Sequence, residues 1–120
     1  MTTYFYGRCS ADENFEKGSS IATQIERANA YAVIHNLKID KEISESISGS
    51  IRFANRPLGL ELMNDLKRDD HIICSALDRF SRNTLDLLQL IEKFKKMKIN
   101  LHFAEFGNVT SSSAMGLVFV

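Results

Sequence analysis

Short runs rich in β-branched and aromatic residues alternate with amphipathic stretches along this 120-residue chain. This alternation constrains the fold most, because strands separated by helices are typical of an α/β domain with a mostly parallel sheet. We therefore expect a three-layer domain of flavodoxin-like topology, in which helices flank a central sheet of about four to five strands. The expected strands are residues 2–7, 39–43, 71–76 and 101–106, and the expected helices are residues 20–35, 57–68 and 79–98.

The helix assignments depend on apolar side chains that recur at helical spacing. Pro57 suits a first helical turn, where its missing N–H would have no partner in any case. Residues 12–19, 44–55 and 107–112 are expected to be loops, and residues 113–120 to open a further helix. The three apolar stripes comprise Ile21, Ile25, Ala28, Ala32 and Leu37, then Leu58, Leu62, Met63 and Leu66, then Leu87, Leu88, Ile91 and Phe94.

Composition excludes several classes of protein. Fifteen Lys and Arg balance fifteen Asp and Glu, and a net charge of zero argues against a nonspecific polyanion binder, although it permits a local arginine cluster. No apolar run approaches the roughly 20 residues of a membrane span, and the N-terminus lacks a signal-peptide pattern. Cys9 and Cys74 match no zinc spacing and are too few for a disulfide scaffold, so we expect a reducing, cytoplasmic compartment.

A first polar cluster leaves the first expected strand. Because strand side chains alternate, Tyr6, Arg8 and Ser10 point the same way if the chain stays extended. An arginine beside a hydroxyl suits a phosphate, since the guanidinium binds the oxygens while Oγ approaches phosphorus. The alternative is an ordinary loop serine beside a surface arginine.

A second polar cluster follows the strand at 71–76 and enters a helix. Arg79 and Arg82 are three residues apart, so on one helix they would share a face near its N-terminus, where anions are favoured. Asp78 is expected to act as helix N-cap or to orient an arginine. The alternative is that both arginines pair with surface acids.

A third candidate group is Ser48, Arg56 and the preceding Glu45, in a polar segment that could equally be a surface loop. Other chemistries have less support. His35, His71 and His102 show no metal-ligand spacing and are expected to be structural. The chain also has no phosphate loop followed by Lys-Ser/Thr and no G-x-S-x-G elbow.

Five motifs occur in an order that resembles the resolvase/invertase group of serine site-specific DNA recombinases: YGRCS, SSIATQIERA, ESISGS, NRPLGLELMNDL and LDRFSRNTLDLL. The resemblance runs from about Thr3 to Val120. Y-x-R-x-S is a weak motif by itself, but it is fairly specific when L-D-R-[FL]-x-R-[ND] follows some 70 residues later. The departures are Glu45, where the family usually has aspartate, and a longer segment before Arg56.

The resemblance implies a metal- and ATP-independent reaction without a cofactor. Ser10 would attack a DNA phosphodiester and form a 5′-phosphoserine intermediate, which is religated after strand exchange. Arg8, Arg79 and Arg82 would surround the scissile phosphate, with Arg56 as a further active-site arginine. The remaining site residues would be Asp78 in the catalytic set and Tyr6, Gln24, Glu45 and Ser48 in support.

The same resemblance implies DNA as partner, with a homodimer and a synaptic homotetramer in the full-length protein, located in the cytoplasm and on the nucleoid. We expect residues 1–120 to be the catalytic domain, truncated at the start of a long dimerisation helix and without its DNA-binding domain. The isolated domain should bind DNA weakly and not recombine it. The alternatives are a noncatalytic flavodoxin-like regulatory module, or a nuclease or phosphatase that uses the same serine.

Overall fold

A computed structural model describes residues 1–10 and 20–110. The expected loop at 12–19 and the expected helix at 113–120 lie outside these residues. The strands are β1 (Thr3–Cys9), β2 (Lys41–Ser46), β3 (His71–Cys74), β4 (Asn100–Phe103) and β5 (Gly107–Asn108). The helices are α1 (Ile21–Ile34), α2 (Pro57–Asp65), α3 (Leu77–Phe80) and α4 (Thr84–Met97), with a 3-10 turn η1 at Phe53–Asn55.

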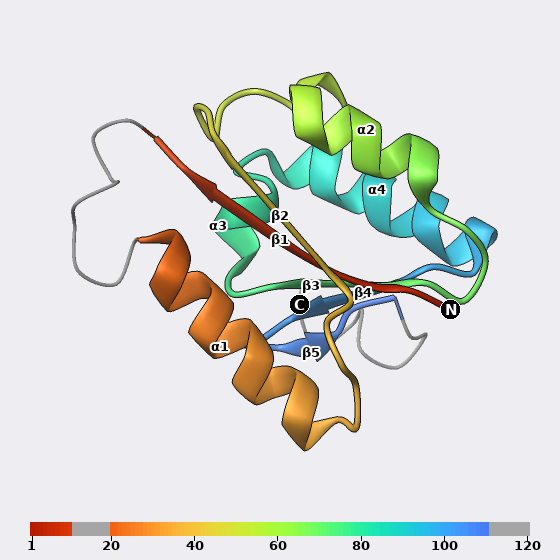
Figure 1. Cartoon of the computed structure of the whole chain (residues 1–120). Helices are drawn as coiled ribbons and strands as arrows, with labels where there is room; N and C mark the ends of the chain where they lie inside the picture. Colours follow the sequence, from red (N-terminus) through yellow and green to blue (C-terminus); the bar gives the residue numbers. More distant parts are fainter. Residues whose placement is uncertain (11–19, 111–120) are drawn as a thin grey trace.

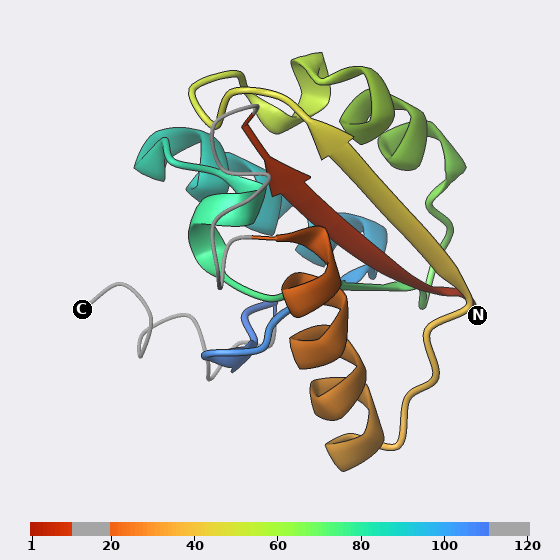
Figure 2. The same ribbon diagram turned by 60° about the vertical axis from the view of Figure 1, so that its left-hand side comes forward.

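The strands form one sheet in the order β2-β1-β3-β4-β5. β1 to β4 are parallel, and β5 pairs with β4 in the antiparallel direction. Helix α1 covers one face, while α2 and α4 cover the other (Figures 1 and 2). The three-layer α/β architecture expected from the sequence is therefore confirmed.

The larger core fills the space between the sheet and helices α2 and α4. Because strand side chains alternate, Tyr4 and Tyr6 of β1 face this side. Tyr6 packs edge-on against Phe53, with 4.9 Å between ring centroids, and Phe53 stacks on Phe80 at 4.2 Å. Each such buried ring contributes about 2 kcal/mol, so this cluster fixes the segments before Arg56 and around α3.

The smaller core lies under α1. Phe5 and Ile73 from the sheet pack against Ala28, Tyr31 and Ala32 of the helix, and the two alanines allow close approach. The expected start near residue 20 is confirmed, because Ser20 is the N-cap and its side chain accepts a hydrogen bond from the Thr23 N–H.

Two expected boundaries around β2 were wrong. The strand was expected at 39–43 and a loop at 44–55, but β2 continues to Ser46, and η1 interrupts the later segment. Residues 44–46 pair with Gly7, Arg8 and Cys9 of β1. Residues 44–46 are polar, so the sequence pattern assigned them to a loop. A strand tolerates such side chains here because β2 lies at the exposed edge of the sheet.

The expected helix over 79–98 is divided in two, and part of the expected loop at 107–112 is β5. Ser81 is extended (φ −156°, ψ 139°), and its Oγ donates to the Asn83 carbonyl. Asn83 then caps α4 by accepting from the Asp86 N–H at 2.9 Å. Ser and Asn side chains compete with helical backbone bonds, so the chain stops and restarts here.

Within residues 1–10 and 20–110, none of the helices combines the length and apolar character that crossing a bilayer requires.

Candidate active site: arginines at the carboxyl edge of the sheet

Three segments meet where β1, β2 and β3 end: residues 9–10, the loop 47–52, and α3. The strand order places β1 between the other two, and the connection after β2 crosses over β1 to reach β3. In open α/β sheets, ligands bind at such a change of direction, beyond the carboxyl ends of the strands. The fold therefore gathers both arginine-bearing motifs at the edge where a ligand is expected.

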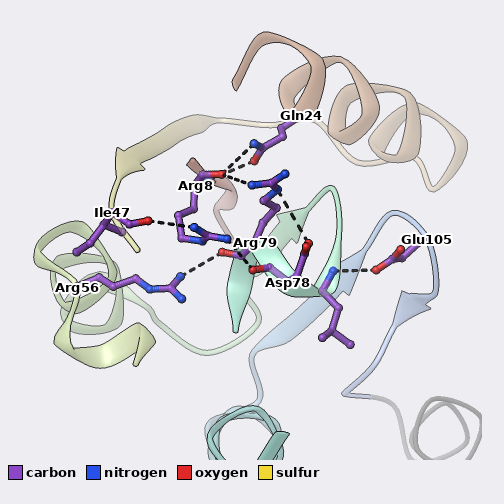
Figure 3. A network of polar contacts seen from close by, with 8 residues as sticks. Arg8, Gln24, Ile47, Arg56, Asp78, Arg79 and Glu105 are labelled. Carbon is purple, nitrogen blue, oxygen red and sulfur yellow. Dashed lines mark hydrogen bonds and ion pairs between the residues drawn. The ribbon is translucent and has the colours of Figure 1, made fainter. Parts of the chain in front are cut away.

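Arg8 joins these segments. Its side chain is fully buried, and its guanidinium donates to the Ile47 carbonyl at 3.0 Å and to the Asp78 carbonyl at 3.1 Å (Figure 3). Gln24 of α1 holds the Arg8 main chain from the other side: its Oε1 accepts from the Arg8 N–H (3.2 Å) and its Nε2 donates to the Arg8 carbonyl (3.0 Å). The end of β1 is thus fixed from both faces of the sheet, just before Ser10.

Arg79 and Arg82 lie beside Arg8 but do not share a helix face as expected. Arg79 is buried in α3, and its guanidinium donates to the Arg8 carbonyl at 3.3 Å. Arg82 lies between α3 and α4 and is exposed. A Cβ added to Gly49 would lie 2.7 Å from Arg82 Nε and 2.9 Å from Arg8 Nη2, so both side chains press against this glycine.

Asp78 is not the N-cap that the sequence suggested as one of two roles. The residue at the α3 N-cap is Ala76, and Asp78 lies inside the first turn. Its carboxylate instead lies 4.0 Å from Arg79 Nε, which supports its other expected role beside an arginine. The Asp78 side chain is 56% exposed, so its carboxylate is well solvated and the contribution of this pair to stability is small.

Arg56 is fully buried, and its contacts are carbonyl and hydroxyl oxygens. Nε donates to the Ile51 carbonyl (2.9 Å), and Nη1 donates to the Arg79 carbonyl (3.1 Å) and the Tyr6 hydroxyl (3.2 Å). Its guanidinium carbon also lies 5.9 Å from the centre of the Phe53 ring. These oxygens satisfy the hydrogen bonds of the buried guanidinium, and the Tyr6 hydroxyl connects it to the Glu45 carboxylate.

Tyr6 and Glu45 connect Arg56 to the first turn of α2. The Tyr6 hydroxyl donates to Glu45 Oε2 at 2.6 Å. Burial raises the pKa of Tyr6, and the hydrogen bond to Glu45 raises it further. Ser48 has a more local contact: its exposed Oγ lies 2.8 Å from Ser50 Oγ and accepts from the Ser50 N–H, which stabilises the turn.

Ser10 directly follows the last residue of β1 and is partly exposed. It stands two residues after Arg8, whose side chain and main chain are both held in place. Ser10 therefore lies at the same edge of the sheet as Arg8, Arg79 and Arg82. The arrangement suits attack on a tetrahedral anion bound among them.

Sequence reasoning missed Glu105. Its carboxylate accepts a hydrogen bond from the Leu77 N–H at 2.8 Å and so anchors the start of α3 (Figure 3). Glu105 comes just after β4, the neighbour of β3. The signal available was its position, because polar residues that follow adjacent parallel strands meet at one edge.

The three histidines gather on the α1 face of the sheet, around Tyr31. The Tyr31 hydroxyl lies 2.7 Å from His102 Nδ1, His102 Nε2 lies 2.8 Å from His71 Nδ1, and the His35 ring stacks on Tyr31. In the described part of the chain, no cluster of three or more His, Cys, Asp or Glu could hold a metal ion.

Comparison with known proteins identifies the family of this chain. Residues 3–120 match the family described as "Resolvase, N terminal domain". The chain is 30% identical to the transposon Tn2501 resolvase of Escherichia coli over 78% of its length and 48% of that protein. It is 31% identical to the transposon Tn917 resolvase of Enterococcus faecalis over 95% of its length and 54% of that protein.

The chain thus spans about half the length of these relatives. Its fold is similar to the crystal structure of the N-terminal catalytic domain of TP901-1 integrase, with a TM-score of 0.82 and 25% identity over 98% of this chain and 89% of that one. Motifs, fold and relatives agree, and the chain belongs to the resolvase/invertase family of site-specific serine recombinases.

Proposed function

We propose that this domain cleaves and rejoins DNA at specific sites, with Ser10 as nucleophile. The Ser10 Oγ–P bond forms as the bond from phosphorus to the 3′ oxygen breaks. The hydroxyl proton leaves to a base, and the 3′ oxygen takes up a proton. The products are a 5′-phosphoserine linkage and a free 3′-hydroxyl. The observation that carries the proposal is the gathering of Arg8, Arg79 and Arg82 at the strand end that Ser10 follows.

The arginines would stabilise the charge that builds up during attack. Negative charge on the nonbridging oxygens grows at the transition state, and guanidinium groups already held in place stabilise it without rearranging. Arg8 and Arg79 are buried and bonded to main chain, which makes them such fixed donors. In other enzymes the loss of one such donor costs on the order of 3 kcal/mol.

The reaction would need neither a metal ion nor ATP. Fixed guanidinium groups supply the positive charge, and the phosphoserine ester conserves the energy of the broken bond for religation. The 3′-hydroxyl of a second strand then attacks phosphorus, and Ser10 leaves. Recombination by the whole protein would require DNA as partner, a homodimer and a synaptic homotetramer, as the family resemblance implies, and would take place on the nucleoid.

A covalent-adduct assay tests the proposal. The protein carrying this chain is incubated with a plasmid bearing the junctions of its own genetic element, and the reaction is quenched in denaturant. We expect a protein–DNA adduct with the wild type and with Ser44→Ala, an exposed serine on β2, but none with Ser10→Ala. An adduct of normal yield from Ser10→Ala would reject Ser10 as nucleophile. An adduct and cut DNA without rejoined product would favour a nuclease. The absence of an adduct with every variant, wild type included, would favour the noncatalytic module.

A further inference from the structure

The Glu45 carboxylate joins three elements of the fold. Its Oε2 accepts from the Tyr6 hydroxyl of β1 at 2.6 Å, and its two oxygens accept from the Leu58 and Gly59 N–H groups, each at 3.1 Å. These N–H groups belong to the first turn of α2, where free donors and the helix dipole favour a carboxylate. One side chain of β2 therefore ties β1 and α2 together.

The Tyr6 hydroxyl extends this connection to Arg56. It donates its proton to Glu45, and its oxygen accepts from Arg56 Nη1 at 3.2 Å. A neutral hydroxyl can do both at once, and the surroundings of Tyr6 keep its pKa above the ordinary value. The buried guanidinium is thus linked to a carboxylate through one hydroxyl group.

Arg56 in turn holds two main-chain segments. Nε and Nη2 donate to the Ile51 and Gly49 carbonyls, at 2.9 and 3.5 Å, and Nη1 donates to the Arg79 carbonyl at 3.1 Å. These bonds fix the loop 47–52 on one side and α3 on the other. Since Arg56 is fully buried, its donors are directed into the fold.

The segments that Arg56 holds are those that shape the arginine cluster. The Ile47 carbonyl accepts from Arg8, and Gly49 is in close contact with both Arg8 and Arg82. The other segment is α3, which contains Arg79. A shift in either segment would separate the guanidinium groups.

We propose that Glu45 is a positioning residue for DNA cleavage, which holds Arg8, Arg79 and Arg82 in one cluster through Tyr6 and Arg56. Arg56 then acts as a clamp on the main chain and not as a ligand of the phosphate. The catalytic consequence rests on the proposed function above. The immobilisation of Arg56 by Glu45 does not, and it is measured separately.

The first measurement is hydrogen exchange of the Arg56 Nε–H, by NMR on the 120-residue chain. Arg56→Lys identifies the resonance by removing it. Glu45→Gln removes the charge and replaces one accepting oxygen with a donor, and Tyr6→Phe removes the hydroxyl but leaves the contacts to α2. We expect exchange at least roughly tenfold faster in both variants, because local opening becomes easier.

Two matched controls lie on the same strands. Glu42→Gln alters an exposed carboxylate of β2, and Tyr4→Phe alters a buried tyrosine on the same face of β1 as Tyr6. Exchange of the Arg56 Nε–H should stay at the wild-type rate in both. A comparable acceleration in the controls would mean that any change on these strands loosens the site, which would overturn the proposal.

The second measurement is the rate of adduct formation at saturating DNA by the protein carrying this chain. Glu45→Gln and Tyr6→Phe should slow it about 10- to 100-fold, by analogy with the loss seen in metal sites when a hydrogen-bond partner of a metal ligand is removed. Because DNA is saturating, a weaker affinity of either variant for DNA does not contribute to this rate.

The outcomes separate the two proposals. Faster exchange with an unchanged adduct rate would overturn the positioning role, and a slower adduct rate with unchanged exchange would overturn the route through Arg56. If Glu45→Gln fails to fold, Tyr6→Phe decides by the same two readouts. An adduct from Ser10→Ala would reject the proposed function, while the exchange data would still test the link from Glu45 to Arg56.

Discussion

Arginines at the site differ in how they are held. Arg8 and Arg56 are fully buried and donate to main-chain carbonyls, whereas Arg82 is exposed and lies against Gly49. A guanidinium bonded to backbone keeps its place when an anion arrives, and an exposed one can adjust to the anion. The cluster therefore combines fixed donors with one adaptable donor.

Replacement of Gly49 by alanine should disturb this cluster without disturbing the fold. The new Cβ would lie 2.7 Å from Arg82 Nε, and the exposed Arg82 side chain can move aside. It would also lie 2.9 Å from Arg8 Nη2, which has to shift by only a few tenths of an ångström. We expect Gly49→Ala to slow adduct formation by roughly tenfold or more, because misplaced donors stabilise the transition state less well. The rate of single-turnover cleavage measures this effect.

The control for this prediction is Ser50→Ala, the next residue of the same turn. Both variants should unfold at the same denaturant concentration as the wild type, to within about 0.5 kcal/mol in stability. Normal cleavage by Gly49→Ala would show that the closeness of Arg8 and Arg82 at this glycine is unimportant for the reaction.

The proximity of Arg8 and Arg79 could be expected from the sequence, but their hydrogen-bond acceptors could not. Arg8 lies near the carboxyl end of β1 and Arg79 follows β3, and such positions converge at one end of a parallel sheet. The partners of Arg8 are the Ile47 and Asp78 carbonyls, and any residue provides a carbonyl. The burial of Arg56 escaped prediction for the same reason, since its neighbours Ile51 and Gly49 carry no signal of the contact.

At the scale of elements, the irregular segments position the site, and these were the hardest to predict. Residues 79–98 have the apolar spacing of one helix, yet side-chain bonds of Ser81 and Asn83 divide them. The division places Arg82 outside both helices, beside Gly49. Periodicity reveals which face of a helix is apolar, but it does not reveal where capping side chains end the helix.

Gly59 should be essential for packing α2 against η1. A Cβ at this position would lie 2.2 Å from the Phe53 carbonyl oxygen, which is backbone and cannot move by itself. We expect Gly59→Ala to destabilise the domain by about 1–3 kcal/mol, the usual range for overpacking. Urea unfolding measures it, with the half-exposed Leu60→Ala on the same helix as control. Equal stability of the two variants would contradict this account of the contact.

The contact between α1 and the sheet should weaken in acid. Burial lowers the pKa of His102 to about 4, and its neighbours His71 and His35 add to the effect. The unfolded chain takes up this proton near pH 6.5, so it binds more protons than the folded chain between pH 6.5 and 4. Stability should therefore fall as the pH drops through this window, by on the order of 3 kcal/mol from His102.

The contact between His71 and His102 also predicts that stability falls in acid. When His71 and His102 both carry two protons, their facing nitrogens at 2.8 Å are both donors and the bond is lost. Urea unfolding at pH 7.5, 6 and 4.5 tests the prediction by comparing the wild type with His102→Gln. The variant should be less stable at pH 7.5 and should lose less stability on acidification. An equal loss in both proteins would exclude His102 as the source.

At the scale of the whole molecule, positive charge is concentrated in the arginine cluster, while the net charge of the sequence is zero. Over the full sequence, fifteen basic residues balance fifteen acidic ones, so the total charge gives no overall attraction to a polyanion such as DNA. Sequence composition gives the zero total but does not predict where the charges lie, because it sums them without placing them. The fold adds the placement, since three separate segments carry the cluster to one edge.

The 120-residue chain should accordingly bind DNA weakly and with little dependence on salt. If Arg8, Arg79 and Arg82 grip a single phosphate, the slope of log K against log salt should be about −0.9, compared with about −10 for a full repressor. Fluorescence anisotropy with a labelled duplex should give a Kd no tighter than roughly 10⁻⁶ M at physiological salt.

Two variants test whether the arginine cluster is the surface that binds DNA. Arg82→Gln should weaken this binding further. Arg68→Gln, an exposed arginine before β3 at the opposite edge of the sheet, should leave it unchanged. Nanomolar affinity, or a steep slope that survives Arg82→Gln, would mean that DNA contacts a surface other than the arginine cluster.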